Sequence, residues 1–506
     1  IVANNALQKS QNNLSTSIER LSSGYKINGS KDDAAGCAIS EKMRAQIRGL
    51  SQAQNNTADG VSVLNTAEGA ITEIQSMLTR LKELSVQAAN DVNSDDEREA
   101  IQKEIEQINN EIDRISDQTE FNTQSLINGN LSRRVYSDLQ GVNQLSVSDS
   151  YTAGVYGITV TEDARQAIAV GAGSITMSST ASITKEQEGT ININGYKISI
   201  SEGDTLDKVM GKIIDGVNIT GGSAFTVKDL NNDTAANGTD YAGYVPTADY
   251  AGSTLVIMTN QYGSDQKMNI TCDNAELADI LGIPQAATQD GIYVEGSDVK
   301  AEIATGDDGK RIGFADSAIL STKGTVITVT DVNNKEFSMD VPGNAAGTVF
   351  DDSNNDGQSA AGAGTARTIS QEVTDVGTMS IHVGANQDQV IVIDIPAITT
   401  YSLGTEHMNV MTQYTASRAI STVDEAINKT NKIRSRIGAY ENRFDHTTNN
   451  LEVSSENLTK SLSTMIDTDM SEEMTTYTSE TVLTQAATSI LAQANERPSQ
   501  VLQLLQ

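Results

Sequence analysis

Histidines are the first residues to consider, because two of them one helical turn apart can bind a catalytic zinc ion. The motif His-Glu-x-x-His supplies those two ligands together with a general base. The chain has three histidines, His382, His407 and His446, and they are far apart in the sequence. Spacing also supports no Ser-His-Asp or Cys-His grouping. The sequence therefore predicts no metal site and no enzymatic activity.

Two acidic stretches imitate the beginning of a calcium-binding loop. Residues 352–357 start like one, but the loop needs a bidentate Glu at its twelfth position, where this chain has Ala363. Residues 229–233 lack even the glycine of that pattern. No glycine-rich loop follows a strand and opens a helix, as a phosphate site would require. We expect solvated loops at both places and no bound cofactor.

The overall charge excludes two classes of partner. Acidic residues number 67 against 35 basic residues, so the net charge is −32. Phosphate binding needs a basic face, which excludes nucleic acid and disfavours an anionic membrane surface. No apolar run is long enough to span a membrane. Cys37 and Cys272 fall in segments assigned to different domains, so we expect two free thiols.

Long helices near both ends are the elements that organise the chain. Apolar residues spaced three or four apart indicate a coiled-coil seam, interrupted by Gln54 and Thr57. The seam consists of Met43, Ile47, Leu50, Val61, Leu64, Ala67, Ile71, Ile74, Leu78 and Leu81. A second seam runs through Ile101, Ile105, Ile108, Ile112 and Ile115, and residues 90–94 break the two apart. The C-terminal part repeats every seven residues at Ile437, Phe444, Leu451, Leu458 and Met465. These patterns predict a helical hairpin that shares its seam with a third helix.

The outermost ends carry weaker apolar stripes. Residues 1–23 and 471–496 are rich in Asn, Gln, Ser, Thr and Ala, and such helices are marginal in water. Their apolar residues are Leu7, Leu14, Ile18, Leu21, Val482, Ile490 and Leu491. Pro498 is expected to stop the last helix and to leave an apolar tip that includes Leu502 and Leu505. We predict that these ends are disordered in the monomer and order on assembly.

The middle of the chain has the alternation of β structure. Ile191 and Ile193 precede Asn194-Gly195, a strong hairpin signal, and Ile198 and Ile200 follow it. A short helix capped by Asp204 or Thr205 comes next, and strands follow at residues 255–259 and 268–271. Residues 290–377 indicate further strands with turns at 308–309 and 333–334, and residues 379–395 alternate around another turn. The fold class expected is multidomain α+β, with a coiled-coil bundle formed by both termini and β-rich domains inserted between them.

Several motifs at the two ends, in the same order along the chain, resemble those of bacterial flagellin, the subunit of the flagellar filament. They are SIERLSSG at 17–24, KDDAAG at 31–36, LKELSVQA at 81–88, NEIDR at 110–114, SILAQAN at 489–495 and VLQLL at 501–505. The resemblance covers roughly residues 1–128 and 378–506. The family pattern begins before Ile1, so we expect the given sequence to start late. The middle resembles the β-β-α-β-β insertion module of flagellins and hook-associated proteins.

The resemblance implies a division of the chain into eight segments. The N-terminal inner-tube helix and spoke would be 1–32, the outer-tube hairpin 33–128, and a β-rich connector 129–178. The insertion module would be 179–289, a second outer β domain 290–378, and a β-hairpin 379–404. The C-terminal outer-tube helix would be 405–465 and the C-terminal inner-tube helix 466–506. The resemblance thus places the terminal helices in the tube and the β domains outside it.

One recognition site follows from the resemblance. Arg80 and Leu84 lie one turn apart on one helix and Glu104 lies on the next, at positions that form the epitope of the innate flagellin receptor, a Toll-like receptor. Arginine beside an apolar residue is typical of interface hot spots. The alternative is that these residues, Leu84 above all, serve packing first and that the receptor exploits them.

The function expected is that of a secreted structural subunit, which polymerises into the extracellular filament for swimming. Its expected partners are other copies of itself, an export chaperone, the cap protein, hook-associated proteins and the host Toll-like receptor. Two alternatives remain open at this point. The chain could be a hook–filament junction protein, which shares the terminal helices and the insertion module. It could also be a filament subunit whose outer domain is an adhesin.

Overall fold

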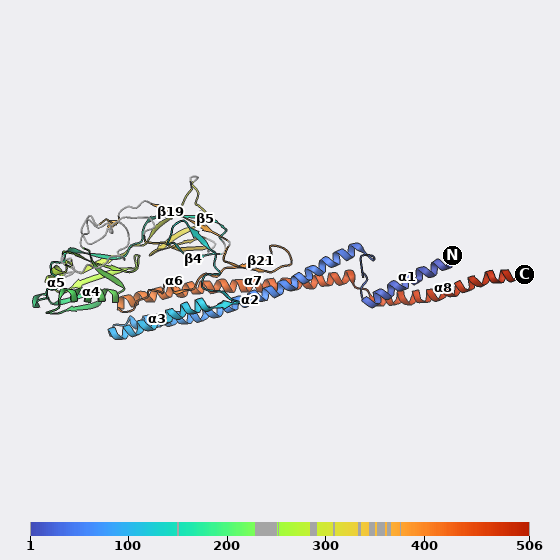
Figure 1. The fold of residues 1–506 in the computed structure, drawn as a ribbon, viewed down its shortest axis with the longest axis horizontal. Helices are drawn as coiled ribbons and strands as arrows, with labels where there is room; N and C mark the ends of the chain where they lie inside the picture. Colours follow the sequence, from blue (N-terminus) through green and yellow to red (C-terminus); the bar gives the residue numbers. More distant parts are fainter. Residues whose placement is uncertain are drawn as a thin grey trace. The chain divides into compact units, whose positions relative to one another are not determined.

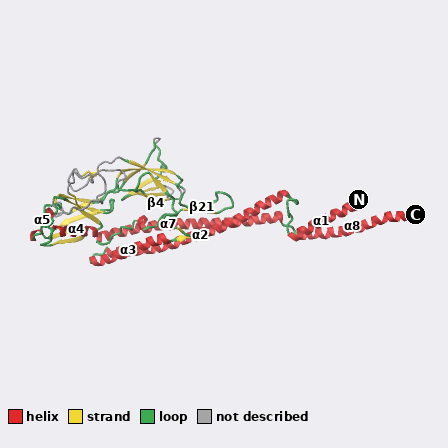
Figure 2. Ribbon diagram, in the orientation of Figure 1, coloured by secondary structure: helices red, strands yellow, loops and turns green. Residues whose placement is uncertain are grey.

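A computed structural model describes residues 2–148, 151–227, 250, 252–283, 291–306, 309–331, 335–343, 350–351, 360–361, 366–374 and 376–504. Helices occupy both ends of the chain and strands the middle, as the sequence predicts (Figures 1 and 2). The chain forms two compact units. The first contains Ile1–Ser62, Ser380–Ile391 and Tyr440–Gln506, and the second contains Val63–Met379 and Val392–Ala439.

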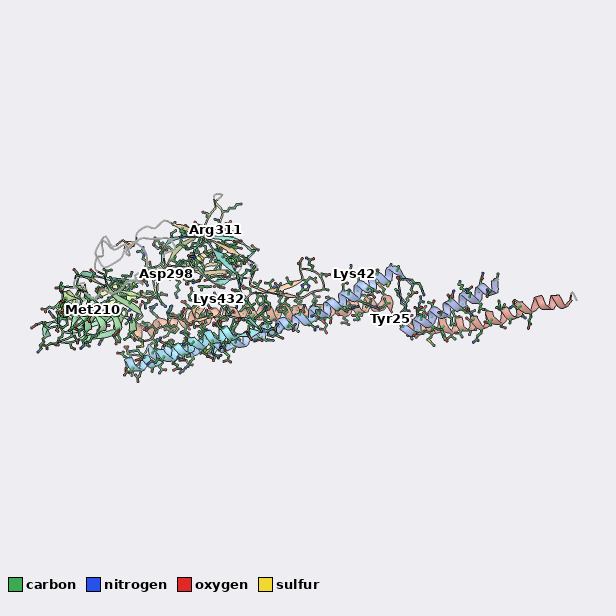
Figure 3. All side chains as sticks on the ribbon, viewed as in Figure 1. Tyr25, Lys42, Met210, Asp298, Arg311 and Lys432 are labelled. Atoms are coloured by element: carbon green, nitrogen blue, oxygen red, sulfur yellow. The ribbon has the colours of Figure 1, made fainter. Side chains whose placement is uncertain are left out.

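The first unit holds both chain ends in paired helices. Helix α1 spans Val2–Ser23 and α8 spans Met470–Leu504, and they lie side by side (Figure 1). After α1 the chain follows an irregular connector, residues 24–33, which contains the expected spoke; Gly24 has a φ of 78° there, and Tyr25 is labelled in Figure 3. The connector is hydrogen-bonded to the segment that precedes α8, because the Lys26 N–H donates to the Ile466 carbonyl at 2.6 Å.

Two long helices form the rest of the first unit and continue into the second. They are α2, Ala34–Ala88, and α7, Gln413–Ile466. Leu50, Ala53 and Leu451 make a small core in the first unit, and Ala385 from a hairpin packs on it. That hairpin, β20 (Met379–His382) and β21 (Val390–Ile393), confirms the predicted turn between residues 379 and 395. Thr57, the polar interruption of the seam, is fully buried and donates its hydroxyl proton to the Ala53 carbonyl at 2.7 Å.

The helical hairpin of the second unit follows the predicted seams. Helix α3 spans Asp95–Gln118 and begins with a capping box, in which Ser94 accepts from the Glu97 N–H and Glu97 accepts from the Ser94 N–H. Leu64, Ile71, Ile74, Leu78, Leu81, Ile105 and Ile112 are completely buried. Helix α7 contributes Ile437, and Lys82 Nζ lies 2.6 Å from Asp424 Oδ1. A short helix, α6 (Thr400–Leu403), precedes α7.

The insertion module of the second unit consists of two antiparallel sheets and two helices. One sheet has the order β6-β10-β9 and the other β12-β11-β7-β8. The strands are β6 (Ile168–Ser174), β7 (Gly189–Ile193), β8 (Tyr196–Ile200), β9 (Gly222–Val227), β10 (Thr254–Thr259), β11 (Lys267–Cys272) and β12 (Ile292–Glu295). Helix α4 spans Leu206–Ile219 after the N-cap Thr205, α5 spans Ala275–Ile280, and a 3-10 turn, η1, spans Lys185–Gln187.

The predicted hairpin of this module is confirmed. β7 pairs with β8, and Asn194 and Gly195 both have positive φ angles, 50° and 92°, as a two-residue hairpin turn requires. The core gathers apolar residues of both sheets and both helices, including Ile191, Met210 (labelled in Figure 3) and Leu277. At the base of the module Arg165 and Ser297 form a β-bridge, with the Arg165 N–H donating to the Ser297 carbonyl at 2.7 Å.

A second β region combines strands from both sides of the module. Its sheets have the orders β13-β5-β19-β3 and β14-β15-β16-β4, with every pairing antiparallel. Its strands are β3 (Val135–Ser137), β4 (Asn143–Val147), β5 (Gly154–Glu162), β13 (Lys300–Ile303), β14 (Ile319–Lys323), β15 (Val326–Thr330), β16 (Glu336–Asp340) and β19 (Arg367–Val373). The core contains four aromatic rings, Tyr151, Tyr156, Phe314 and Phe337, whose centroids lie 5.1–6.1 Å apart.

Four two-residue strands complete the described elements. They are β1 (Glu120–Phe121), β2 (Gln124–Ser125), β17 (Phe350–Asp351) and β18 (Ala360–Ala361). Asp308, the turn residues 333–334, the acidic stretch 352–357 and the stretch 229–233 lie outside the described residues. Cys37 and Cys272 are free thiols, which confirms the expectation that they do not pair.

Candidate assembly and recognition surfaces

The contact between α1 and α8 is polar. The Ser10 hydroxyl donates to Glu480 Oε2 at 2.6 Å, and the Asn13 amide donates to Glu480 Oε1 at 2.9 Å. About two turns further along, Arg20 Nη1 lies 3.6 Å from Glu473 Oε2. Ser10, Ser17 and Glu473 are buried, with 7%, 3% and 8% of their surfaces exposed. Two small serines therefore let the helices approach, and the Glu480 carboxylate of α8 accepts from Ser10 and Asn13 of α1.

The apolar side chains of the same two helices remain largely in contact with solvent. Ile18 is 49% exposed on α1, and Val482, Leu483 and Ile490 are 53–59% exposed on α8. The other residues expected to mediate inner-tube assembly, Leu7, Leu14, Leu21 and Leu491, are half-buried. Leu502 lies within α8, and Leu505 lies outside the described residues. Leu483 was not singled out from the sequence, although its neighbour Val482 was. Among the described residues of the two helices, the buried side chains are thus polar and the apolar ones are exposed or half-buried, unlike a monomeric core.

The prediction that Pro498 stops the last helix is wrong. Helix α8 continues through this residue to Leu504. A proline inside a helix removes one backbone hydrogen bond and kinks the helix, but it does not forbid helical angles on either side. The Ala, Gln, Glu and Leu residues around Pro498 are good helix formers, which favours continuation of the helix.

The hairpin of the second unit carries an exposed ion-pair cluster. Arg80 on α2 donates to Glu104 on α3 through Nη2 at 2.8 Å and through Nε at 3.0 Å, and to Glu83 through Nη1 at 3.1 Å. The hydrogen bond to Glu104 is the main reason that the pKa of Arg80 is raised above its usual value. About half of each partner's side chain in the Arg80–Glu104 pair is exposed. Glu83, which the sequence did not single out, completes this cluster.

Leu84 does not lie on the same face as Arg80 and Glu104. It is 1% exposed and belongs to the buried stripe with Leu81 and Ala88. The structure therefore brings Arg80 and Glu104 together and places Leu84 beneath them in the core. A partner that approaches this hairpin meets the ion pair, and it does not reach the Leu84 side chain.

Metal and membrane chemistry have no structural support in the described parts of the chain. Among those residues no group of three or more His, Cys, Asp or Glu side chains could hold a metal ion. The backbone carbonyl of His382 accepts a hydrogen bond from Asn56 at 3.0 Å, and the side chain of His407 is 69% exposed. No described helix is both long enough and apolar enough to cross a bilayer.

Comparison with known proteins agrees with this arrangement of terminal helices. The family model described as the bacterial flagellin N-terminal helical region matches residues 1–132, and that of the C-terminal helical region matches residues 420–505. A flagellin of Salmonella typhimurium is 31% identical over 530 residues, which span 100% of this chain and 98% of the relative. A flagellin of Clostridium tyrobutyricum is 29% identical over 501 residues, 98% of each chain.

Among solved structures, a flagellar hook associated protein-3 from Legionella pneumophila is similar at 13% identity with a TM-score of 0.29. The similarity covers 84% of this chain and 98% of that one. The sequence relatives extend over the helical ends and over the β-rich middle alike. The chain therefore belongs to the bacterial flagellins, the structural subunits of the flagellar filament.

Proposed function

We propose that this flagellin assembles by burying the exposed apolar faces of α1 and α8 against neighbouring copies, which builds the extracellular filament used for swimming. The observation that carries the proposal is the inverted polarity of the helix pair. Ser10, Ser17 and Glu473 are buried between the helices, while Ile18, Val482, Leu483 and Ile490 face outward. Apolar side chains that are this exposed in the single chain are typical of surfaces that other copies cover in an assembly.

The proposed mechanism couples folding to association. The two helices contain few apolar residues, so tertiary contacts must supply most of their stability. Covering one exposed Ile or Val side chain contributes up to about 1.5–3 kcal/mol, and every added subunit covers several of them. The Ser10–Glu480 and Arg20–Glu473 contacts fix the register of the pair, so each subunit presents the same apolar face.

Seeded polymerisation tests this function. Purified monomer is mixed with short filament seeds and cap protein, and product length is measured by electron microscopy. A filament subunit gives polymers that lengthen with added monomer. Growth that stops after one layer would instead support the hook–filament junction role, and the absence of any growth would refute both. The export chaperone and hook-associated proteins are the further partners that we propose.

We also propose that the cluster of Arg80, Glu83 and Glu104 is where the innate receptor meets this flagellin. The cluster is exposed and lies across the two helices of the hairpin, α2 and α3. Leu84 takes part in this proposal only by supporting the helix from below, since its side chain is buried.

A further inference from the structure

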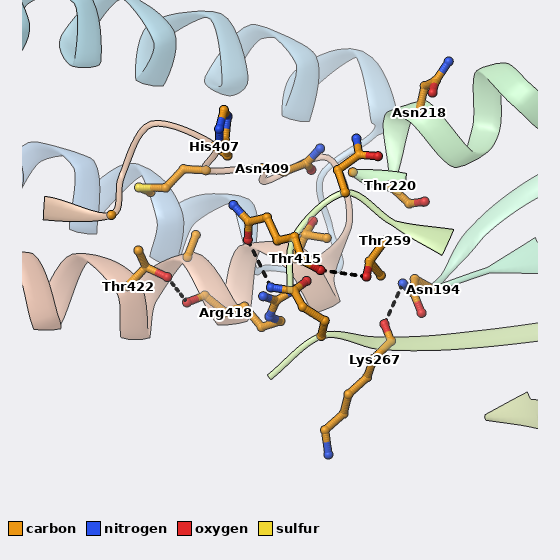
Figure 4. Close-up of a pocket in the computed structure, with 17 residues that line it drawn as sticks. Asn194, Asn218, Thr220, Thr259, Lys267, His407, Asn409, Thr415, Arg418 and Thr422 are labelled. Carbon is orange, nitrogen blue, oxygen red and sulfur yellow. Dashed lines mark hydrogen bonds between the residues drawn. The ribbon is translucent and has the colours of Figure 1, made fainter. Parts of the chain in front are cut away.

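A cavity of about 400 Å³ lies within the second unit, between the insertion module and the start of α7 (Figure 4). The module contributes the hairpin turn at Asn194, the end of α4 and the loop after β10. The other wall consists of Gly404, residues 407–409 and the first turns of α7 with Arg418. The Asn409 amide donates to the Ile219 carbonyl at 2.9 Å, which joins the two walls.

The lining of this cavity differs sharply from the rest of the protein. The chain has 67 acidic and 35 basic residues, yet none of the seventeen described residues around the cavity is Asp or Glu. Lys267 and Arg418 carry positive charge there, and six of the seventeen are Asn or Gln. Four more are Thr. A lining without carboxylates in so acidic a chain favours an anionic ligand.

Arg418 is the cation that remains available. In the described part of the chain its guanidinium makes no hydrogen bond and no ion pair, and its ring contact is with Tyr414, 6.0 Å from the centroid. Lys267 differs, because its Nζ lies 2.7 Å from Glu295 and 5.7 Å from the Tyr293 ring centroid. Figure 4 shows Arg418 at the cavity among side chains of both walls. A planar guanidinium with free donors matches a carboxylate, which it binds through two parallel hydrogen bonds.

The amides indicate what else the ligand carries. Several polar groups of the lining are already satisfied internally, since Asn194 donates to the Lys267 carbonyl and Thr259 donates to the Gln261 carbonyl. The exposed Asn218 side chain makes no such bond among the described residues, and it offers both a donor and an acceptor. An inorganic anion such as phosphate uses donors and leaves amide oxygens unpaired. A sugar uses both, because each hydroxyl donates and accepts.

We propose that this cavity is a binding site for a carboxylate-bearing sugar, with Arg418 holding the carboxylate and the Asn218 amide holding a hydroxyl. The volume is within the range of small-molecule sites, and the lining is more polar than those that take apolar ligands. The site lies within one chain. It is therefore independent of filament assembly, and either proposal can fail without the other.

The test compares two ligands that differ only at the sixth carbon, methyl β-glucuronide and methyl β-glucoside. Binding to the full-length monomer is measured by ligand-observed NMR and calorimetry. The parent should bind the glucuronide in preference to the glucoside. Arg418→Gln should weaken glucuronide binding by at least about tenfold, as expected when one charge-assisted pair is lost, and it should leave the weak glucoside binding unchanged.

Matched variants keep the result interpretable. Arg367→Gln makes the same change at an exposed position of β19 outside the cavity, and it should bind like the parent. Arg418→Lys keeps the charge without the planar fork, so its affinity should lie between those of the parent and Arg418→Gln. Circular dichroism verifies that each variant is folded. Equal binding of the two sugars by the parent, equal glucuronide binding by Arg418→Gln and the parent, or tighter binding of inorganic phosphate would each overturn the proposal.

Discussion

The hydroxyl of Ser10 donates a 2.6 Å hydrogen bond to the carboxylate of Glu480, although 470 residues separate the two in sequence. This bond, with a second one from Asn13, lowers the pKa of Glu480 below its usual value of 4.5. A lowered pKa in the folded state stabilises the α1–α8 pair at pH values above the ordinary glutamate range. The stabilisation is lost as the pH falls through the folded-state pKa, because the protonated carboxyl no longer accepts both bonds.

We therefore expect Glu480→Gln to flatten the acid dependence of filament melting. The parent filament should melt at a lower temperature as the pH falls below about 4.5, and the variant should lose less over the same interval. Scanning calorimetry of filaments between pH 7 and pH 3 makes the comparison. Glu472→Gln, at an exposed position of the same helix, is the control for removal of a charge. Identical pH profiles for Glu480→Gln and the parent would contradict the assignment.

The exposed apolar residues of α8 are expected to govern assembly without governing monomer stability. Ile490→Ser should raise the critical concentration for polymerisation roughly tenfold, since part of a buried isoleucine's contribution is lost at each added subunit. Sedimentation of filaments at a series of protein concentrations gives this value. Val92→Ser changes an equally apolar residue, 84% exposed in the turn between α2 and α3, and should leave assembly unaffected. Similar effects of the two substitutions would argue against α8 as the assembly surface.

Amide exchange should distinguish the ends of the free chain from its helical hairpin. In verified monomer we expect fast exchange over α1 and over residues 470–496, whose apolar side chains have no complete core. The amides near Leu64, Leu78 and Ile105 should exchange slowly, because these side chains are completely buried. In filaments both groups should be protected. Strong protection at Leu14 or Ile490 in the monomer would show that the ends fold before they assemble.

Arg80→Ala should weaken receptor binding about tenfold while leaving folding unchanged, because the side chain lies at the surface and its removal opens no cavity. Surface plasmon resonance with the purified receptor ectodomain measures the affinity. Lys103→Ala, which removes a more exposed cation paired with Glu99 on α3, is the matched control. If both variants bind like the parent, the cluster is not the site of recognition.

Two glycines of α4 should respond to the same substitution in opposite directions. A Cβ at Gly216 would lie 2.5 Å from Ile198 Cδ1, so Gly216→Ala should destabilise the module by about 1–3 kcal/mol. A Cβ at Gly211 would meet open space, so Gly211→Ala should stabilise the helix by up to about 1 kcal/mol. Urea unfolding, monitored by amide hydrogen exchange at β7 and β8, measures the free energy of unfolding of the module in each variant. A neutral Gly216→Ala would mean that Ile198 repacks freely.

The sequence predicts local structure here better than it predicts which strands meet. The seam from Leu64 to Leu81 can be predicted because apolar residues spaced three or four apart mark the buried face of a helix. The hairpin turn can be predicted because Asn194-Gly195 favours the positive φ angles that a two-residue turn requires. The pairing of β5 with β19 cannot be predicted from the sequence. Alternation of apolar residues indicates which face of a strand is buried, and it does not indicate which strand pairs with it. The Thr159 and Thr368 hydroxyls that meet across that ladder are 209 residues apart.

The recognition residues illustrate a finer point. Positions 80 and 84 are one turn apart, which suggests a shared face. The buried stripe, however, passes through Leu81, Leu84 and Ala88, and Arg80 stands beside this stripe on the solvent side. Leu84 lies three residues after Leu81, so the spacing along α2 already assigns it to the buried stripe and separates it from Arg80.

The bridge between Arg165 and Ser297 brings together the two points at which the chain enters and leaves the insertion module. The two residues exchange backbone hydrogen bonds of 2.7 and 3.1 Å, so the polypeptide enters and leaves the module at a single point. Excising residues 166–296 would leave two ends that are already hydrogen-bonded to each other, and a short linker would join them with little loss of chain entropy. We expect the same junction to accept a foreign domain whose termini are adjacent. The two sheets of the second β region contain no strand from residues 166–296, so the described strand pairings of that region do not depend on the module.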